Sequence, residues 1–170
     1  MKPAIWPQAH PATARMMHLA LDSGRLTDER LSNLSSWLQR DDLLVMNDAA
    51  TLHASLRGET AEGQPIEIRL LAREGDEWMA VLFGEGDWHT RTEDRPPPPQ
   101  VREGDRLRLG EIQARVVAAA PHSPRLLRLA LEVSGMSLWE ALYRFGRPVQ
   151  YAHVSRALES WHVQTRYSSQ

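Results

Sequence analysis

The sequence predicts an α/β domain interrupted by an inserted antiparallel β-barrel. Three observations support this fold class: an apolar run at residues 43–46 follows a helical leucine pattern, the middle of the chain alternates apolar and polar residues, and helical periodicity returns after residue 131. We therefore assign residues 1–56 and 132–170 to the α/β domain and residues 57–131 to the barrel.

The N-terminal part is expected to contain two strands and a helix. Residues 16–21 are mostly apolar and are followed at 22–24 by Asp-Ser-Gly, which is typical of a tight turn. Leucines recur at helical spacing after Asp28, so residues 29–39 are predicted to form a helix that Asp28 caps at its N-terminus. Residues 43–46 are too short for a helix and have the composition of a strand buried on both faces.

Asn47 and Asp48 stand at the end of this predicted strand. Ligands of open α/β sheets commonly bind beyond the carboxyl ends of strands, so the position suits a functional site. The alternative is structural, because Asn and Asp often terminate strands and satisfy loop amides. The pattern alone leaves both interpretations open.

The middle of the chain carries five period-two segments separated by glycine and acidic turns. They lie at residues 66–70, 78–82, 106–109, 114–119 and 126–131. This spacing favours a small antiparallel barrel or sandwich, of which we assign the barrel, and residues 84–104, with four consecutive prolines, interrupt it as a loop. The expected inward side chains are Ile66, Ile68, Leu70, Trp78, Leu107 and Val116.

Helical spacing then returns between Ser137, a suitable N-cap, and Gly146, a suitable stop. The remaining segment, from Arg147 onward, is rich in polar and aromatic residues.

Composition excludes several classes of protein. The chain has 170 residues, a net charge of −2 and no cysteine, which excludes disulfides, thiolate nucleophiles and sulfur-ligated metal sites. No two of its seven histidines lie three or four residues apart, so we expect no metal. Neither a signal peptide nor a run of the ~18 apolar residues that would span a bilayer is visible, and we expect a soluble, cytoplasmic protein with no membrane partner.

Several motifs resemble the N-terminal part of the S-adenosylmethionine:tRNA ribosyltransferase-isomerase family. The sequence D-L-L-V-M-N-D at residues 42–48 is similar to the family's G-D-L-L-V-F-N-D-T-R. Residues 63–71 and 78–82 resemble its first barrel strands. Residues 146–151 resemble its G-x-P-L-P-P-Y stretch, and residues 163–165 resemble its Y-Q-T.

The departures from the family pattern are also informative. Ala49 and Ala50 replace its Thr-Arg, and residues 53–56 read His-Ala-Ser-Leu in place of Pro-Ala-Arg-Leu, so two family arginines are absent. The 84–104 loop looks longer than its counterpart, and a later P-T-A-G-L-H-F motif is missing. We expect a divergent relative, either a truncated chain or an N-terminal fragment.

The resemblance implies transfer and isomerisation of the ribosyl part of S-adenosylmethionine onto a deazaguanine base in tRNA, which gives epoxyqueuosine. It implies S-adenosylmethionine as cosubstrate, no metal, tRNA as partner, and either a homodimer or a missing C-terminal half. The 170-residue chain alone is expected to be inactive. The alternative is a noncatalytic RNA- or nucleotide-binding module, which the residues Ala49, Ala50 and Ser55 favour.

Six residues are the candidate site. By the resemblance, Asp48 is the catalytic base or a ligand-orienting carboxylate, and the substrate contacts are Asn47, Arg147, Tyr151, Gln164 and Thr165. Each also has a structural interpretation, such as a loop cap for Asp48, a solvated side chain for Arg147 and a core edge for Tyr151. If the site is real, Asn47 and Asp48 should lie close to Gln164 or Thr165, in a cleft between the α/β part and the barrel.

Overall fold

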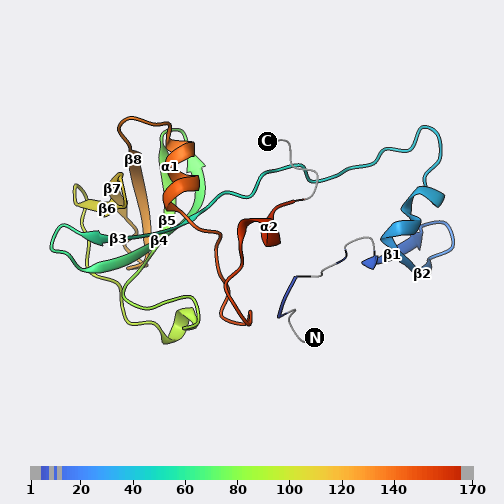
Figure 1. Ribbon diagram of the computed structural model, residues 1–170, viewed down its shortest axis with the longest axis horizontal. Coiled ribbons are helices and arrows are strands. Elements are labelled where there is room, and N and C mark those ends of the chain that lie inside the picture. Colours follow the sequence, from blue (N-terminus) through green and yellow to red (C-terminus); the bar gives the residue numbers. More distant parts are fainter. Residues whose placement is uncertain (1–4, 8–9, 11–12, 166–170) are drawn as a thin grey trace.

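The computed structural model describes residues 5–7, 10 and 13–165, and its main body is a closed barrel of six antiparallel strands (Figure 1). The barrel strands are β3 (Ser55–Thr60), β4 (Pro65–Glu74), β5 (Glu77–Phe83), β6 (Arg106–Leu109), β7 (Ile112–Ala119) and β8 (Leu126–Glu132). A separate hairpin consists of β1 (Arg15–Ala20) and β2 (Arg25–Arg30). The helical elements are the 3-10 helices η2 (Leu31–Ser36) and η3 (Thr92–Asp94) and the α-helices α1 (Leu138–Phe145) and α2 (Ser160–Val163).

The barrel closes through β3. Its strand order is β3-β4-β5-β8-β7-β6, and β3 pairs with β6 where Thr60 lies opposite Leu107. A Cβ on Gly58 would lie 2.0 Å from the backbone oxygen of Arg108, so the two strands can approach this closely only with glycine there. Closure leaves the barrel without a free strand edge.

The core of the barrel confirms the predicted alternation. All six side chains expected to face inward are buried, with exposed fractions of 6% or less. The largest fully buried side chains also include Leu56, Leu82, Ile112 and Leu129. The central fold prediction, an antiparallel barrel, is therefore confirmed.

Helix α1 packs against this core and has the predicted ends. The Ser137 side chain accepts a hydrogen bond from the Glu140 amide at 3.2 Å, and the Glu140 carboxylate accepts in return from the Ser137 amide at 2.8 Å. These contacts hold the pKa of Glu140 below its ordinary value, with the backbone hydrogen bond from Ser137 as the largest cause. Leu142 is fully buried, and the helix ends at Gly146.

The N-terminal hairpin corrects one prediction. The expected strand and tight turn at residues 16–24 are confirmed, but of the helix expected at residues 29–39 only the 3-10 helix η2 (Leu31–Ser36) is present. Strand β2 continues to Arg30, and the Leu31 amide still donates to the Ala14 carbonyl, so the hairpin ladder occupies the residues that would begin the helix. Asp28 bonds to the Arg15 guanidinium instead of capping a helix.

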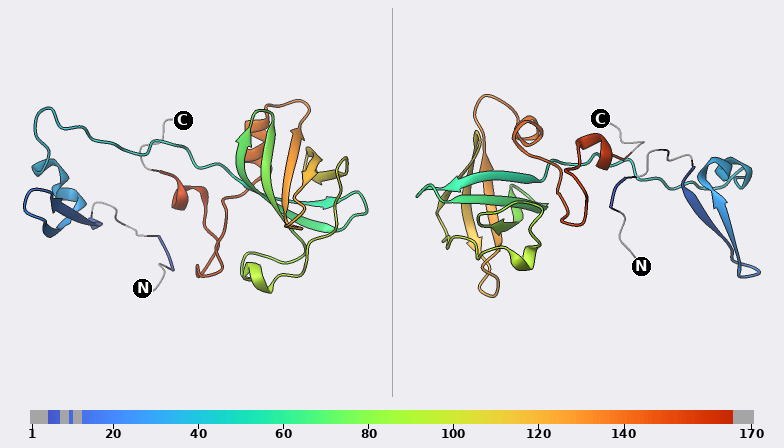
Figure 2. Two further views of the ribbon diagram at one scale, coloured as in Figure 1. Left: turned by 180° about the vertical axis from the view of Figure 1, so that it is seen from behind. Right: turned by 60° about the horizontal axis from the view of Figure 1, so that its bottom comes forward.

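The predicted buried strand at residues 43–46 is also wrong. This segment has no regular secondary structure, and Leu43 and Val45 are 88% and 83% exposed. A buried strand needs neighbouring strands on its edges, and none of the strands in the described part of the chain pairs with it. Figure 2 shows the hairpin and this extended segment lying away from the barrel.

The α/β part of the predicted fold is therefore only partly confirmed, because beside the barrel there is a small sheet with few helices. The division into domains at 1–56, 57–131 and 132–170 stays a prediction. Strand β3, which the sequence analysis missed, begins at Ser55. Its sequence, Ser-Leu-Arg-Gly-Glu-Thr, lacks a regular alternation of apolar residues. Of the helices in the described residues, none is long and apolar enough to cross a membrane.

Replacing Leu107 by alanine is expected to lower the free energy of unfolding by ~2–5 kcal/mol, because the cavity left in a closed barrel cannot collapse fully. Leu71→Ala is the matched control, since Leu71 is 57% exposed on β4, and its effect should stay within ~0.5 kcal/mol. Urea unfolding followed by tryptophan fluorescence measures both. Equal effects of the two variants would contradict the assignment of Leu107 to the core.

Candidate functional site

Two segments that carry predicted site residues meet beside the barrel. The Thr51 amide donates to the Gln164 side-chain oxygen at 3.1 Å, across 113 residues of sequence, and the Thr51 hydroxyl donates to the Val163 carbonyl at 2.9 Å. The Thr165 hydroxyl donates to the Ala49 carbonyl. We call these contacts the junction. It brings residues 49–51, which directly follow Asn47 and Asp48, together with residues 163–165.

Asn47 and Asp48 lie directly before this junction, on exposed backbone. The Asn47 side-chain oxygen accepts a hydrogen bond from the Ala49 amide at 3.0 Å, which is the local turn of the structural interpretation. Within the described residues, the Asp48 carboxylate has neither a hydrogen bond nor an ion pair. It is therefore accessible to a ligand.

The other two predicted residues, Arg147 and Tyr151, lie in different places. Arg147 pairs with Ser55 through two backbone hydrogen bonds, of 3.0 and 2.8 Å, and its exposed side chain lines a cleft beside β3. Tyr151 is 52% exposed, its ring lies 5.7 Å from that of His153, and it is not among the residues that line this cleft. Asn47, Asp48, Gln164 and Thr165 do not line this cleft either, so it does not unite the predicted residues, and a cleft shared by Asn47, Asp48 and Gln164 stays a prediction.

The cleft beside β3 has a volume of about 530 Å³. Its walls come from the start of β3, the 84–104 loop, the end of α1 with the residues after it, and the start of α2. Side chains two residues apart on an extended chain point the same way, so His53, Ser55 and Arg57 share the face toward the cleft. Gly146 allows the walls to approach, because a Cβ there would lie 2.3 Å from the His53 backbone oxygen.

His53 connects three elements at this wall. Its Nδ1 lies 3.0 Å from the Tyr143 carbonyl oxygen and its Nε2 lies 2.6 Å from the Ser160 hydroxyl oxygen. A carbonyl can only accept, so Nδ1 is the donor to Tyr143, and in the tautomer with its proton on Nδ1 the ring accepts the Ser160 proton at Nε2. The Ser160 hydroxyl is thereby oriented, and α2 is held against the segment before β3.

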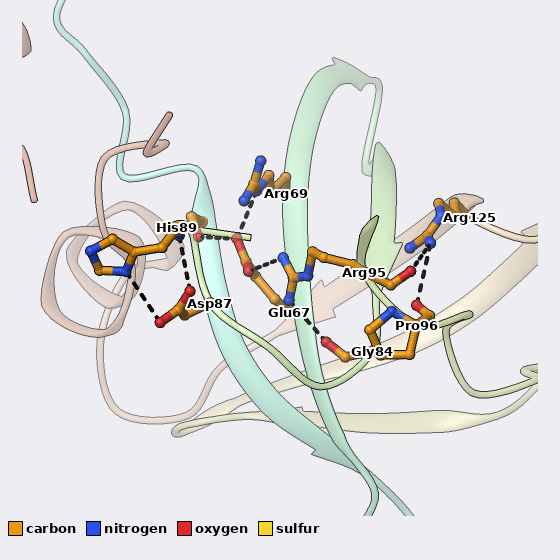
Figure 3. A network of polar contacts seen from close by, with 9 residues as sticks. Glu67, Arg69, Gly84, Asp87, His89, Arg95, Pro96 and Arg125 are labelled. Atoms are coloured by element: carbon orange, nitrogen blue, oxygen red, sulfur yellow. Dashed lines mark hydrogen bonds and ion pairs between the residues drawn. The ribbon is translucent and has the colours of Figure 1, made fainter. Parts of the chain in front are cut away.

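A buried charge cluster stands behind the cleft (Figure 3). The Glu67 carboxylate accepts from the Ser55 hydroxyl at 3.0 Å, from Arg69 Nε at 2.6 Å and from Arg95 Nη1 at 2.7 Å. Arg95 also donates from Nη2 to the Gly84 carbonyl at 2.9 Å. The Arg95 side chain is only 1% exposed, so this ion pair is shielded from water.

Glu67 is buried although it points out of the barrel. Its neighbours Ile66 and Ile68 face the core, so alternation turns Glu67 outward, where the 84–104 loop covers it through Arg95. Burial alone would raise the pKa of Glu67, but the hydrogen bonds from Arg69 and Arg95 outweigh it and lower that pKa. The carboxylate therefore stays ionised and holds the loop on the barrel.

Phe83, on the same face, strengthens this attachment. The guanidinium carbons of Arg69, Arg95 and Arg125 lie 4.5, 4.7 and 5.4 Å from the centre of its ring. Such contacts between cations and aromatic faces are more favourable where water is excluded. Arg125 also donates to the backbone oxygen of Pro96 at 3.3 Å, which ties the start of the proline run to the barrel.

Sequence reasoning missed this cluster and the His53 contacts. Glu67 and Arg69 alternate with apolar residues and therefore match solvent-facing positions of a strand. Arg95 precedes four prolines in a loop, a context that carries no sign of burial. His53 and Ser55 were visible only as departures from the family pattern.

A metal site does not emerge from the geometry. Among the described residues, no group of three or more His, Asp or Glu side chains could hold a metal ion. The expectation that the chain uses no metal stays a prediction.

Comparisons with known proteins complete the description. The family model described as queuosine biosynthesis protein matches residues 2–170. An S-adenosylmethionine:tRNA ribosyltransferase-isomerase of Bradyrhizobium diazoefficiens is 29% identical over 158 residues, which cover 85% of this chain and 38% of that protein. The protein of the same name from Chlorobium luteolum is 30% identical over 105 residues, which cover 62% of this chain and 27% of that protein.

A crystal structure of an S-adenosylmethionine tRNA ribosyltransferase from Thermotoga maritima is similar at 20% identity and a TM-score of 0.36. The match covers 85% of this chain and 44% of that one. The chain thus spans well under half the length of the two curated relatives named above.

Replacing Glu67 by glutamine is expected to lower the free energy of unfolding at pH 7 by ~3–5 kcal/mol, because Arg95 would remain buried without its counter-charge. Glu59→Gln removes the exposed pair with Arg108 and should cost less than ~1 kcal/mol. Urea unfolding of both variants and the parent at several pH values measures this.

The pH dependence follows from the lowered pKa of Glu67. The contribution of ionised Glu67 to the free energy of unfolding is fully present above the pKa of a glutamate in the unfolded chain, about 4.3. It is lost as the pH falls through the lower pKa of Glu67 in the folded protein. The difference between the parent and Glu67→Gln should therefore shrink in acid. A difference that stays constant between pH 7 and pH 3 would contradict an ionised Glu67.

Proposed function

The chain belongs to the queuosine biosynthesis protein family, and on this premise we propose that it acts in S-adenosylmethionine:tRNA ribosyl transfer and isomerisation. In this reaction the ribosyl part of S-adenosylmethionine passes to a deazaguanine base in tRNA, which gives epoxyqueuosine and releases adenine and methionine. The observation that carries the proposal is the junction. It joins the Asn47–Asp48 segment to the Gln-Thr segment, and both match the family's motifs.

Asp48 is the proposed base or ligand-orienting carboxylate of this reaction. The sulfonium centre of S-adenosylmethionine acidifies the adjacent ribose carbon, so a positioned base can remove its proton before the ring opens and the amine of the tRNA base attacks. The Asp48 carboxylate is exposed, and within the described residues it has no partner that would compete with a ligand. The side-chain oxygen of Asn47 accepts the hydrogen bond of the local turn, so the side-chain NH₂ group remains able to donate to a ligand.

The remaining candidates divide by their contacts. Gln164 and Thr165 bind the backbone of residues 49–51, so we propose that they position Asn47 and Asp48. Arg147 and Tyr151, whose side chains are exposed, are proposed to contact the substrate. An arginine suits this task because its planar group donates to phosphate in two directions.

Catalysis is proposed to need groups beyond those of this chain. The curated relatives are much longer than the matched region, and an active site must be completed by groups in fixed positions. A binding module without turnover is the alternative, and the same experiment separates the two.

The test is release of adenine from S-adenosylmethionine in the presence of tRNA that carries the aminomethyl-deazaguanine base. We expect no release by the 170-residue chain alone. Release is expected from a chimera in which this chain replaces the matched part of the Bradyrhizobium relative. A folded chimera that binds tRNA without releasing adenine would support the binding module, and turnover by the isolated chain would contradict the need for further groups.

In that chimera, Asp48→Asn is expected to lower the rate of adenine release by ~10²–10⁴-fold, the usual contribution of a general base. The matched control is Asp41→Asn, because Asp41 is also exposed in the same linker and asparagine tolerates its positive φ of 75°. Equal rates for the two variants would remove Asp48 from the reaction.

A further inference from the structure

We infer that the cleft beside β3 binds an unpaired RNA nucleotide, with its base stacked on Trp88 and its phosphate held by Arg57 and Arg147. The inference rests on the proposed function only in taking RNA as the ligand. It assigns a nucleotide contact to the 84–104 loop, separate from Asp48 and the junction.

The two arginines face the cleft from paired backbone. Arg57 follows Ser55 by two residues on β3, and Arg147 lies directly opposite Ser55 in the antiparallel bridge. Residues opposite each other in such a pair, and residues two apart on one strand, present their side chains on the same face. Both side chains are exposed and line the cleft, and within the described part of the chain neither guanidinium has an ion-pair or hydrogen-bond partner.

The acidic groups of the cleft do not neutralise these two charges. Glu67 lies opposite Arg57 in the strand register, but its carboxylate is taken by Arg69 and Arg95. Glu159, the other acid in the lining, forms no ion pair with either arginine among the described residues. Two uncompensated guanidiniums at the mouth of a cleft are well suited to bind a phosphate.

Trp88 supplies an aromatic surface on the loop side of the cleft. Its ring stacks on His89 with centroids 3.8 Å apart and an angle of 27° between the planes. Asp87 fixes His89, because its carboxylate accepts from the His89 amide at 2.9 Å and lies 3.2 Å from Nδ1. These hydrogen bonds, with that from the His89 side chain the largest cause, hold the pKa of Asp87 below its ordinary value, so the charge that orients the histidine persists.

The buried Glu67–Arg95 pair keeps this aromatic surface in place. Arg95 ties the loop to β4 and to Gly84, so residues 84–95 are anchored at both ends while Trp88 reaches the cleft between them. Figure 3 shows Asp87 and His89 beside the cluster of Glu67, Arg69 and Arg95. A stacking surface that is already positioned costs little entropy when a base binds.

An aromatic ring and free arginines around one open cleft are the combination by which proteins bind single-stranded nucleic acid. An acidic peptide would use the arginines but would not need Trp88. A duplex would keep its bases stacked on one another and could not use the indole ring. The dependence of binding affinity on Trp88 therefore distinguishes single-stranded RNA from an acidic peptide and from a duplex.

The test measures binding of a fluorescein-labelled, unstructured RNA of ten nucleotides to the 170-residue chain by anisotropy, with no S-adenosylmethionine present. Trp88→Ala should weaken binding by roughly 5- to 150-fold, the range for loss of one stacked base, and Trp88→Phe should retain most of the affinity. Trp139→Ala is the matched control, because Trp139 is also half-exposed but lies on α1, outside the lining of the cleft.

The phosphate contacts have a separate readout. Arg57→Ala and Arg147→Ala should each reduce the slope of log affinity against log salt concentration by about 0.7, the value for one phosphate of a single strand. Arg115→Ala, an exposed arginine on β7 outside the cleft, should leave the slope unchanged. Thermal unfolding of each variant confirms that it is folded.

Three results would overturn the inference: no binding of the RNA by the parent chain, equal binding by Trp88→Ala and the parent, or equal competition by a duplex or by oligoglutamate. The assay needs neither turnover nor the modified base. If the RNA does not bind through Trp88 but the chimera still releases adenine, the nucleotide contact is rejected and the proposed reaction is not. RNA binding through Trp88 without adenine release would reject the proposed reaction alone.

Discussion

Strand β3 is the constraint on which both the barrel and the cleft depend. It pairs with β4 along one edge and with β6 along the other, and it therefore closes the barrel. The bridge between Ser55 and Arg147 adds a third backbone partner at its beginning. Because its inward side chain Leu56 is fully buried, the flanking positions Ser55 and Arg57 must point outward, and the cleft is built on that outward face.

The cleft also needs a covered outer surface, which the Glu67–Arg95 ion pair provides. Removing two charges from water costs several kcal/mol per ion, and further hydrogen bonds offset part of this cost. Here Ser55, Arg69 and the Gly84 carbonyl supply such bonds, while the buried Nε of Arg95 has no hydrogen-bond partner among the described residues. A loop thus covers the charged outer face of a strand, and the same loop carries Trp88 to the cleft.

The barrel could be predicted from the sequence because its alternation is local. Ile66, Ile68 and Leu70 repeat at period two, and a single buried face follows directly from that repeat. The run at residues 43–46 could not be judged in the same way, because burial of a continuous apolar run depends on neighbours that the run itself does not encode. The prediction of Asp28 as a helix cap failed for a related reason. Asp28 belongs to β2, which pairs with β1, so the residues expected to begin the helix form the end of a strand instead.

The predicted site residues stay a prediction, although two of the motifs that carry them do meet. Gln164 and Thr165 contact residues 49–51, directly after Asn47 and Asp48, whereas Glu67 and Arg95 are brought together only by the path of the 84–104 loop. No periodicity reports such a contact, since its partners lie 28 residues apart and one of them belongs to no regular element.

The junction and the cleft are distinct but mechanically connected. Helix α2 contributes Ser160 to the cleft, and the residues directly after it, Gln164 and Thr165, hold the junction. The segment that they contact runs from Ala49 through His53 into β3, so a displacement of α2 would act on both places through hydrogen bonds. Occupancy of the cleft can therefore influence the position of Asp48 without any direct contact between Asp48 and the nucleotide bound there. In the proposed arrangement the cleft would hold RNA, and the junction would set the geometry of the Asp48 carboxylate.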